Sequence, residues 1–466
     1  MNAEAGRPGG KISRRGFARA GVAAALTGAA WSRAGGANER IGVGIIGFGL
    51  IGRIHTRNFL QQPDVAVAGI SEVYKPRMEA GAQLIGGDVR RYPDFRKMLE
   101  SKDIDAVVIA TPDHWHALMS MMACAAGKDV YVEKPMTLFV REGRWMVDIA
   151  RRHKRVVQVG TQQRSGLHYQ RARELYRSGH LGKLVSVECT YWRNLMPGFG
   201  KPPDGPPPAD LDWNLFLGPA PERPYNPNRG IYHFRWFWDT SGGQMTNLGH
   251  HSLDVVHWFT GVPGPTAVAS MGGRRYLEDN CEVPDTQDAI LEYPGFMAYC
   301  SWRECTAGAP GAGMGGLAFH GTSGTMTTSR DGFQIIPDAK ANPNNVVAAI
   351  LGGHPVGGPQ PVPEGPRPPR TTAVKDSSGD MDALYRLHIR DFLDAIRSRK
   401  EPASDVLSGH QIAATCHLAN ISLLTGRRIE WDPEKEEIRG DPEASRMLRR
   451  PYRAPWDAEL RALGVQ

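Results

Sequence analysis

The feature that most constrains this fold is a short apolar segment followed at once by three closely spaced glycines. Residues 41–46 (IGVGII) have the pattern of a buried strand. Gly47, Gly49 and Gly52 follow in the stretch GFGLIG, and a helical pattern begins near the last of them. A second apolar segment covers residues 65–70, and Glu72 stands just past its end, 20 residues after Gly52. This order of strand, turn, helix and strand predicts the first unit of a doubly wound parallel sheet.

The same spacing predicts a dinucleotide site, with an ordinary glycine-rich turn beside an incidental acid as the alternative. Glycines let the backbone approach a pyrophosphate, and the start of the helix supplies free N–H groups and a positive dipole end. Glu72 would accept hydrogen bonds from the adenosine ribose. Its carboxylate repels a 2′-phosphate, so NAD is favoured, although the nearby Lys75 and Arg77 leave NADP open. The predicted contacts are Gly47, Phe48, Gly49, Leu50, Ile51, Gly52 and Glu72.

Polar residues follow three further apolar segments, at 104–110, 129–132 and 156–159. Ligands of doubly wound sheets bind beyond the carboxyl ends of the strands. We therefore expect the cofactor to meet further residues at those ends, namely Thr111, Pro112, His116, Glu133, Lys134 and Gln163.

A chain of 466 residues with a hydrophobic fraction of 41% is too long for one ordinary core. We expect a nucleotide-binding domain over residues 38–160 and a second domain over 161–466. In the second part, strands are predicted at 183–193, 267–270, 289–293, 297–302 and 317–320, and helices at 383–398 and 409–424. Loops rich in Gly and Pro are predicted at 196–210, 307–316 and 355–370. The tail from 427 to 466 is predicted to form an arm that wraps a neighbouring copy.

The N-terminal 37 residues have the pattern of an export signal. SRRGF at 13–17 precedes an uncharged stretch at 20–32, and small residues follow at 34–37. The arginine pair favours the twin-arginine export machinery and a periplasmic location, with a disordered basic tail as the alternative. This segment holds six Lys or Arg and one Glu, so it accounts for +5 of the net charge of +7. Nucleic-acid binding therefore loses its compositional support, and no apolar run is long enough to span a membrane.

The six cysteines show no metal-ligand spacing. Buried free thiols are the favoured interpretation, and a disulfide is left open because an oxidising compartment would permit one.

Several motifs together resemble the glucose-fructose oxidoreductase and inositol dehydrogenase (Gfo/Idh/MocA) family. They are GFGLIG at 47–52, ATPDHWH at 110–116, EKP at 133–135 and GGQMTNLGHHSLD at 242–254. The segments at 388–393, 396–399 and 431–433 look like the exported branch of that family. The resemblance implies a Rossmann domain, and a C-terminal α+β domain with a large, mostly antiparallel sheet. It also implies hydride transfer between NAD(P) and a sugar or polyol, and association of copies through the open face of the second sheet.

Motif matching makes Lys134 the active-site lysine and His251 the active-site histidine. Oxidation of an alcohol carbon requires its hydroxyl to lose a proton, and a lysine whose pKa is lowered by burial and by a nearby positive nicotinamide can assist. The alternative for Lys134 is a solvated surface lysine. The Lys134–Pro135 bond is a candidate for the cis form.

Asn247 is the departure from the family pattern, which commonly has Asp four residues before the histidine. If residues 244–258 are helical, Asn247 and His251 share one face. An amide cannot take a proton, so Lys134 and His251 are left as the titrating pair. A buried histidine satisfied within the core is the alternative for His251.

Substrate contacts are predicted at five positions, Arg164, Trp236, Trp238, Asp239 and His250. Aromatic faces stack on the C–H surface of sugar rings, and charged groups bind hydroxyls; core packing is the alternative for the tryptophans. A zinc site made from the His and Asp residues at 250–257 lacks a recognised ligand spacing, so no metal is predicted.

Three functions remain open on this basis. The first is an NAD(P)-dependent oxidoreductase acting on a sugar, polyol or glycoside. The second is a redox-neutral glycosidase, lyase or epimerase with a tightly retained cofactor, which export favours because free NAD is not expected outside the cytoplasm. The third is a non-catalytic sugar-binding protein, against which Lys134 and His251 argue.

Overall fold

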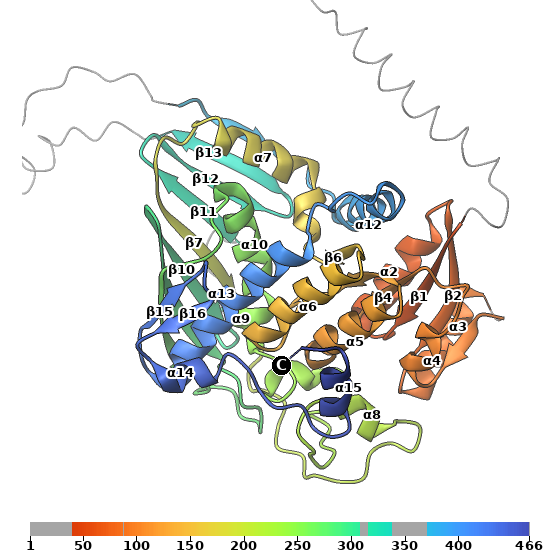
Figure 1. The fold of residues 1–466 in the computed structure, drawn as a ribbon. Helices are drawn as coiled ribbons and strands as arrows, with labels where there is room; N and C mark the ends of the chain where they lie inside the picture. The colour runs from red at the N-terminus through yellow and green to blue at the C-terminus, as the bar shows by residue number, and fades with distance from the viewer. Residues whose placement is uncertain (1–39, 87, 308–315, 338–370, 466) are drawn as a thin grey trace, which may run out of the picture.

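The computed structural model describes residues 40–86, 88–307, 316–337 and 371–465, and these form two sheets with helices packed against them (Figure 1). The predicted export segment at 1–37 and most of the predicted loops at 307–316 and 355–370 lie outside the described residues.

The first sheet has six parallel strands in the order β3-β2-β1-β4-β5-β6. The strands are β1 (Ile41–Ile46), β2 (Val65–Ser71), β3 (Arg90–Tyr92), β4 (Ala106–Ile109), β5 (Asp129–Val132) and β6 (Val157–Val159). The helices between them are α2 (Leu50–Leu60), α3 (Lys75–Ile85), α4 (Phe95–Leu99), α5 (Asp113–Ala125) and α6 (Val140–Arg152). This strand order reverses beside β1, where doubly wound sheets bind dinucleotides, and it confirms the predicted Rossmann domain.

The second sheet has ten strands in the order β14-β13-β12-β11-β7-β10-β9-β8-β15-β16, and only β7 and β10 pair in parallel. This confirms the large, mostly antiparallel sheet. Its strands are β7 (Leu184–Trp192), β8 (Ala267–Gly273), β9 (Thr286–Tyr293), β10 (Phe296–Arg303), β11 (Gly316–Gly321), β12 (Gly324–Ser329), β13 (Gly332–Pro337), β14 (Val374–Asp376), β15 (Ile429–Asp432) and β16 (Glu437–Arg439).

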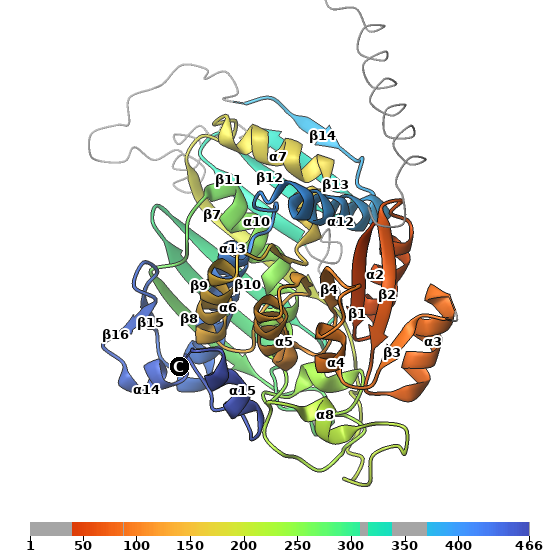
Figure 2. The same cartoon turned by 45° about the vertical axis from the view of Figure 1, so that its right-hand side comes forward.

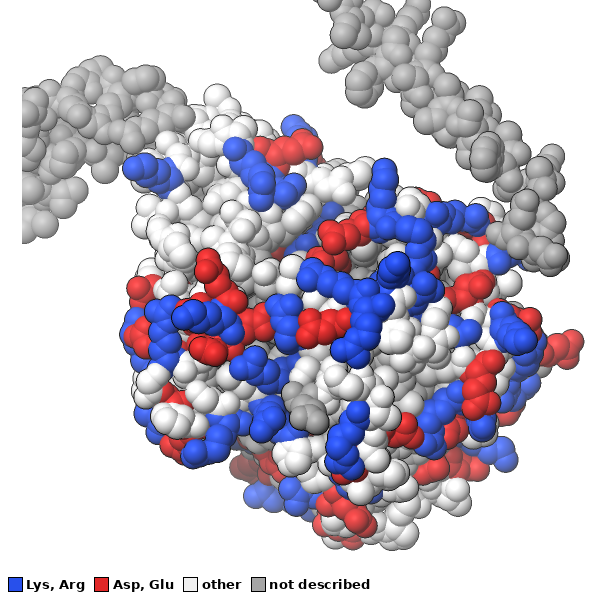
Figure 3. Space-filling model, in the orientation of Figure 1, with Lys and Arg blue, Asp and Glu red and all other residues white. Residues whose placement is uncertain are grey.

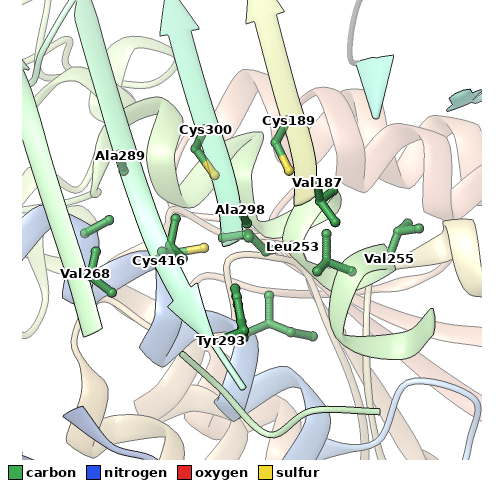
Figure 4. Close-up of a cluster of buried hydrophobic side chains, with 14 of the residues drawn as sticks. Val187, Cys189, Leu253, Val255, Val268, Ala289, Tyr293, Ala298, Cys300 and Cys416 are labelled. Atoms are coloured by element: carbon green, nitrogen blue, oxygen red, sulfur yellow. The ribbon is translucent and has the colours of Figure 1, made fainter. Parts of the chain in front are cut away.

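Three helices pack on one face of the second sheet, α7 (Leu167–Arg177), α10 (Gly249–Thr260) and α13 (Val406–Thr425). Alternating residues of the strands are buried against them, as in β9 and β10, so the other face of the sheet stays open. Figure 4 shows this core, with Cys189 and Cys300 on neighbouring strands and Cys416 contributed by α13. All six cysteines are free, as favoured from the sequence.

The remaining short elements lie between β6 and β8 or after β16. They are η2 (Gln162–Ser165), α8 (Trp213–Leu217), η3 (His233–Trp236), α9 (Gly243–Asn247), α14 (Pro442–Arg446) and α15 (Trp456–Ala462). The helix expected over 244–258 is interrupted at Leu248, where α9 ends and α10 begins.

The C-terminal part of the chain returns twice to the first sheet. Helix α12 (Met381–Ser398) places Ile389, Phe392 and Leu393 in one core with β1, and Figure 2 shows α12 beside α2. Further on, Trp456 packs edge-on against Trp115, with ring centroids 4.7 Å apart. The tail predicted to wrap a neighbouring copy therefore packs on its own chain, because its apolar side chains complete the core around α4 and α5. A single division of the chain at residue 160 remains a prediction.

Acidic and basic side chains are interspersed over the face of the molecule seen in Figure 3. Within the described ranges, no helix combines the length and apolar character needed to cross a bilayer.

Candidate active site

The glycine turn between β1 and α2 has the geometry of a phosphate cradle. Gly47 has φ of +90°, and a Cβ on Gly52 would lie 2.1 Å from the Gly47 carbonyl oxygen, so both positions require glycine. A Cβ on Gly49 would meet only Arg77 Nη1, at 3.7 Å, because Gly49 borders open space. The N-terminus of α2 has neither a side-chain cap nor an acidic residue in its first turn. Its N–H groups and dipole are therefore available to an anion.

Glu72 is fixed in place by three backbone N–H donors. Its Oε2 accepts a hydrogen bond from Phe48 N at 2.8 Å, and its Oε1 accepts from Val73 N at 2.8 Å and from Tyr74 N at 3.0 Å. These bonds hold the carboxylate at the rim of the cleft, where a ribose would lie. Phe48 acts through its backbone alone, since its ring packs in a small core with Ile70 and neighbouring side chains.

An open cleft runs along this edge of the sheet. The predicted cofactor residues that line it are Gly47, Gly49, Leu50, Ile51, Glu72, Thr111 and Pro112. Thr111 Oγ1 is buried and has no hydrogen-bond partner in the described part of the chain. A cradle open to an anion, an acid at the ribose position and an unpartnered hydroxyl in an elongated cleft together fit a dinucleotide.

Residues from the second half of the chain form a cover, or roof, over this cleft. The sequence did not predict this cover. Lys75 N donates to Asp210 O at 3.0 Å, and Asp212 N donates to Val73 O at 3.1 Å, so a strap over residues 210–216 is tied to the chain just after Glu72. The roof residues that line the cleft are Leu215, Phe216, Ile231, Tyr232, Phe234 and Arg235. Phe234 and Arg235 directly precede Trp236, which the sequence predicted as a substrate contact.

Three predicted cofactor residues instead support the active-site backbone. His116 lies with Nδ1 2.7 Å from Pro135 O and Nε2 2.8 Å from Thr111 O, so it links two strand ends. Glu133 Oε1 lies 2.6 Å from His55 Nε2 in the interior, and this contact holds the pKa of Glu133 below its usual value despite burial. Gln163 donates from Nε2 to the Tyr169 hydroxyl at 2.8 Å. Each of these side chains thus has a protein partner, and its contact with a cofactor stays a prediction.

Lys134 lies at the end of β5 and is held by the second half of the chain. Its Nζ donates to Asn247 Oδ1 at 2.8 Å and to Asn247 O at 3.0 Å, and Asn247 Nδ2 donates in turn to Gln244 Oε1 at 3.0 Å. The Lys134–Pro135 bond is cis, as suggested from the sequence. Burial lowers the pKa of Lys134 to about 8, with the charges of Arg235 and Arg330 acting in the same direction and those of Glu133 and Asp113 opposing them.

His251 is buried beside this lysine. Burial, then the charges of Lys134 and Arg330, hold its pKa well below 6.5. The lowered pKa favours the neutral ring, which can donate one hydrogen bond and accept another. Titration of His251 together with Lys134 stays a prediction. His250 is fully buried, with both ring nitrogens unpartnered among the described residues, and its pKa is likewise lowered by burial.

The other predicted substrate residues have structural partners. Arg164 is buried in an ion pair with Asp254, with Nη2 2.7 Å from Oδ1, and it also donates to Ala403 O. Trp236 is 5% exposed and packs in a core with Phe237, Cys281 and Val283. Arg450 donates to the Trp238 carbonyl, and Asp239 accepts from Arg223. Core packing and ion pairs favour structural roles at these positions, and substrate contact there stays a prediction.

No group of three His, Cys, Asp or Glu side chains suited to a metal ion occurs in the part of the chain that the structure describes. The His and Asp residues of α10 are separated into distinct contacts, such as that of His257 Nε2 with the Tyr293 hydroxyl at 3.0 Å.

A Rossmann cleft roofed by a second domain, with a lysine of lowered pKa held between the two, defines a two-domain NAD(P)-binding oxidoreductase. Two family descriptions match the chain: "Oxidoreductase family, NAD-binding Rossmann fold" over residues 41–161, and "Oxidoreductase family, C-terminal alpha/beta domain" over 170–272 and 376–458. The chain belongs to the Gfo/Idh/MocA oxidoreductase family.

Two curated relatives share part of the sequence. The rhizopine catabolism protein MocA of Rhizobium meliloti is 27% identical over 222 residues, which cover 48% of this chain and 58% of that protein. Inositol 2-dehydrogenase of Salmonella paratyphi B is 25% identical over 162 residues, which cover 34% of this chain and 48% of that protein. The matches thus span about half the length of these relatives.

Among solved structures, levoglucosan dehydrogenase in complex with NADH and levoglucosan has the same fold. It superimposes with a TM-score of 0.62 over 84% of this chain and 99% of that one, at 18% identity.

Proposed function

We propose that this protein is an NAD-dependent dehydrogenase that oxidises a hydroxyl-bearing carbon of a sugar or polyol. The observation that carries the proposal is the placement of Lys134: it follows β5 at the carboxyl edge of the Rossmann sheet, and its Nζ is held by Asn247 from the other half of the chain. The family membership and the sugar ligand of the levoglucosan dehydrogenase structure support the substrate class.

The residues that would hold the cofactor are Gly47, Gly49, Leu50 and Ile51 at the pyrophosphate, Glu72 at the ribose, and Thr111 and Pro112 further along the cleft. When bound, the nicotinamide accepts a hydride from the substrate carbon. Arg235 lines the cleft from the roof, and its positive charge is close enough to lower the pKa of Lys134. We assign Arg235 to the cofactor phosphates.

The chain's own chemistry rests on Lys134. Its uncharged amine accepts the proton of the substrate hydroxyl as the hydride leaves, and a pKa of about 8 lets that form exist near neutral pH. The two acceptors of Asn247 fix the direction of the amine. His251 is kept neutral, so it positions the hydroxyl by a hydrogen bond without competing for the proton.

The test is NAD reduction by the purified protein with a panel of sugars and polyols. Steady formation of NADH with added NAD supports a dehydrogenase. Turnover of a glycoside with no net NADH would contradict it in favour of the redox-neutral reaction. Binding of sugar with no nucleotide bound and no turnover would favour a non-catalytic protein.

We further propose that the cofactor is retained between turnovers. The roof residues Leu215 and Phe216, with Ile231 to Arg235, cover the cleft, and the hydrogen bonds of Val73 and Lys75 tie the strap to its rim. The cofactor can therefore leave the cleft only when the strap over residues 210–216 opens. Mass spectrometry of the protein purified without added nucleotide should detect bound NAD, and an empty cleft would contradict retention.

We also propose export by the twin-arginine route, on the sequence of residues 1–37. Replacement of Arg14 and Arg15 by Lys should leave the protein in the cytoplasmic fraction, whereas unchanged fractionation would contradict export by that route.

Finally, we propose that copies associate through the open face of the second sheet. Large apolar side chains are exposed there on five strands, namely Val185, Met271, Ile290, Tyr299 and Ile336. Analytical ultracentrifugation should show a dimer or tetramer that a Met271→Glu, Ile290→Lys double variant dissociates. A monomeric parent protein would contradict this interface.

A further inference from the structure

Arg330 is a half-buried arginine without a partner among the residues that the structure describes. It stands in the turn between β12 and β13, and its guanidinium makes no hydrogen bond or ion pair with any described residue. Its neighbour Asp331 is exposed and forms no ion pair with it. Removing a guanidinium from water costs free energy unless a hydrogen-bond acceptor compensates for the lost hydration. The groups around Arg330 therefore show whether the protein supplies such an acceptor.

The turn that carries Arg330 is fixed against the elements around the active site. His168 Nε2, on α7, donates to Ser329 O at 3.1 Å. The next residue, Tyr169, accepts at its hydroxyl from Gln163 of η2. Helices α7, α10 and α12 all pack on η2, and Figure 2 places them with β12 and β13 in one region of the molecule. Because α10 bears His251, the turn lies on the substrate side of the site.

The charge of Arg330 reaches the catalytic groups. Burial lowers the pKa of Lys134 and His251, and the charge of Arg330 acts in the same direction. Burial raises the pKa of Tyr169 and Tyr385, and the charge of Arg330 opposes that rise. These four side chains come from the end of β5, α10, α7 and α12. The charge of Arg330 therefore lies within electrostatic reach of all four side chains.

Among the described residues, no carboxylate forms a hydrogen bond or ion pair with Arg330. Three buried carboxylates lie nearby, and each has another partner: Glu133 contacts His55, Asp254 pairs with Arg164, and Asp113 accepts a hydrogen bond from Ser241 Oγ at 2.5 Å. Arg235 faces the cofactor cleft. With no partner in the described part of the chain, the Arg330 guanidinium can donate directional hydrogen bonds to an anion on the substrate side.

We propose that Arg330 binds an anionic group of the substrate, a carboxylate or a phosphate, so that the carbohydrate oxidised beside Lys134 is a sugar acid or a sugar phosphate. The proposal rests on the proposed function for the carbohydrate and for the oxidation. Recognition of the anion by Arg330 is a separate claim, because it concerns binding alone.

The experiment therefore measures binding apart from turnover. The protein is loaded with NADH, which blocks oxidation, and the affinities of matched probes are measured by calorimetry: glucose with glucuronate and glucose 6-phosphate, and galactose with galacturonate. The variants are Arg330→Gln and Arg330→Lys. Arg386→Gln is the matched control, because Arg386 is an exposed arginine of α12. Thermal melting of each variant checks folding, and NAD reduction by the same probes is measured in parallel.

At least one acid should bind about 10- to 100-fold more tightly than its neutral partner, as expected for a charged hydrogen bond. Arg330→Gln should abolish that preference, Arg330→Lys should keep part of it, and Arg386→Gln should leave it unchanged. Preference for the uronates identifies a carboxylate, and preference for glucose 6-phosphate identifies a phosphate. Equal affinity for every acid and its neutral partner, or a preference that survives Arg330→Gln, would overturn the proposal. Tight anion binding without oxidation of any probe would overturn the proposed function alone.

Discussion

The cofactor side and the substrate side of the active site are built from different kinds of chemical group. The cofactor side is made largely of backbone from one short stretch, in which the Gly47–Gly52 turn and the start of α2 offer N–H groups and Glu72 is held by three of its neighbours' N–H groups. The substrate side is made of side chains from separate elements, with Lys134 from β5, Asn247 from α9 and His251 from α10.

This difference predicts two kinds of sensitivity. A backbone cradle fails when a Cβ intrudes, and changes of nearby side chains matter less. A site made of side chains fails when one functional group is removed, although the fold persists. Substitutions on the two sides should therefore separate nucleotide binding from chemistry.

The largest effect is expected from Lys134→Ala. Without the amine that accepts the hydroxyl proton, kcat should fall by about 10²- to 10⁴-fold. The affinity for NAD, measured by fluorescence titration of NADH, should change little because the cradle is intact. A variant that keeps full activity would contradict the role of Lys134.

The next largest effect is a loss of NADH affinity in one glycine variant of the cradle and a loss of stability in another. Gly49→Ala places a methyl group in the open space meant for the pyrophosphate, so NADH affinity should fall by about tenfold or more while the melting temperature is unchanged. Gly52→Ala drives a Cβ against the Gly47 carbonyl, so unfolding free energy should fall by about 1–3 kcal/mol. Equal loss of stability in both variants would contradict this assignment of the two glycines.

A smaller effect is expected in the pH dependence. Lys134 must be uncharged to accept a proton, so kcat/KM should rise as the pH rises through about 8. Asn247→Asp places a carboxylate beside Nζ, which favours the charged amine and should move this rise upward by about one pH unit or more. Asn247→Leu, which removes the hydrogen bond without adding charge, serves as the control. An unshifted profile in Asn247→Asp would show that another group controls the rise.

The smallest effect is expected at Asp239. Its carboxylate accepts from the exposed Arg223 away from the cofactor cleft, and such pairs contribute about 1 kcal/mol or less. Asp239→Asn should keep kcat/KM within about twofold of the parent for the best substrate of the panel. A tenfold loss would restore Asp239 as a substrate contact.

The sequence predicted best those site residues that come from short contiguous stretches of the chain. The turn at 47–52, Glu72 and the strand ends at Thr111 and Lys134 lie where they were expected, because an apolar strand followed by glycines has few alternative structures. Phe48, His116 and Glu133 were within these motifs, but a motif does not tell a side chain that meets a ligand from one that supports the backbone.

The substrate side depends on contacts that no local pattern contains. Trp236 and Trp238 were predicted to stack on a sugar, yet Trp236 is buried in a core with Cys281 and Val283, far along the chain. Arg164 had the residue type of a substrate contact, and only the fold shows that Asp254 neutralises it. No local sequence pattern marks Arg330, because only the fold brings its charge close to Lys134.

The central claim is that Lys134 serves a substrate carbon facing the bound nicotinamide. It is tested most directly by a single turnover with a substrate from the panel that carries deuterium on the oxidised carbon, followed by mass spectrometry of the extracted nucleotide. The account predicts one deuterium on the nicotinamide in the parent protein and almost none in Lys134→Ala, although both bind NAD. Unlabelled nucleotide from a parent protein that has converted the substrate, or equal labelling in both proteins, would contradict it.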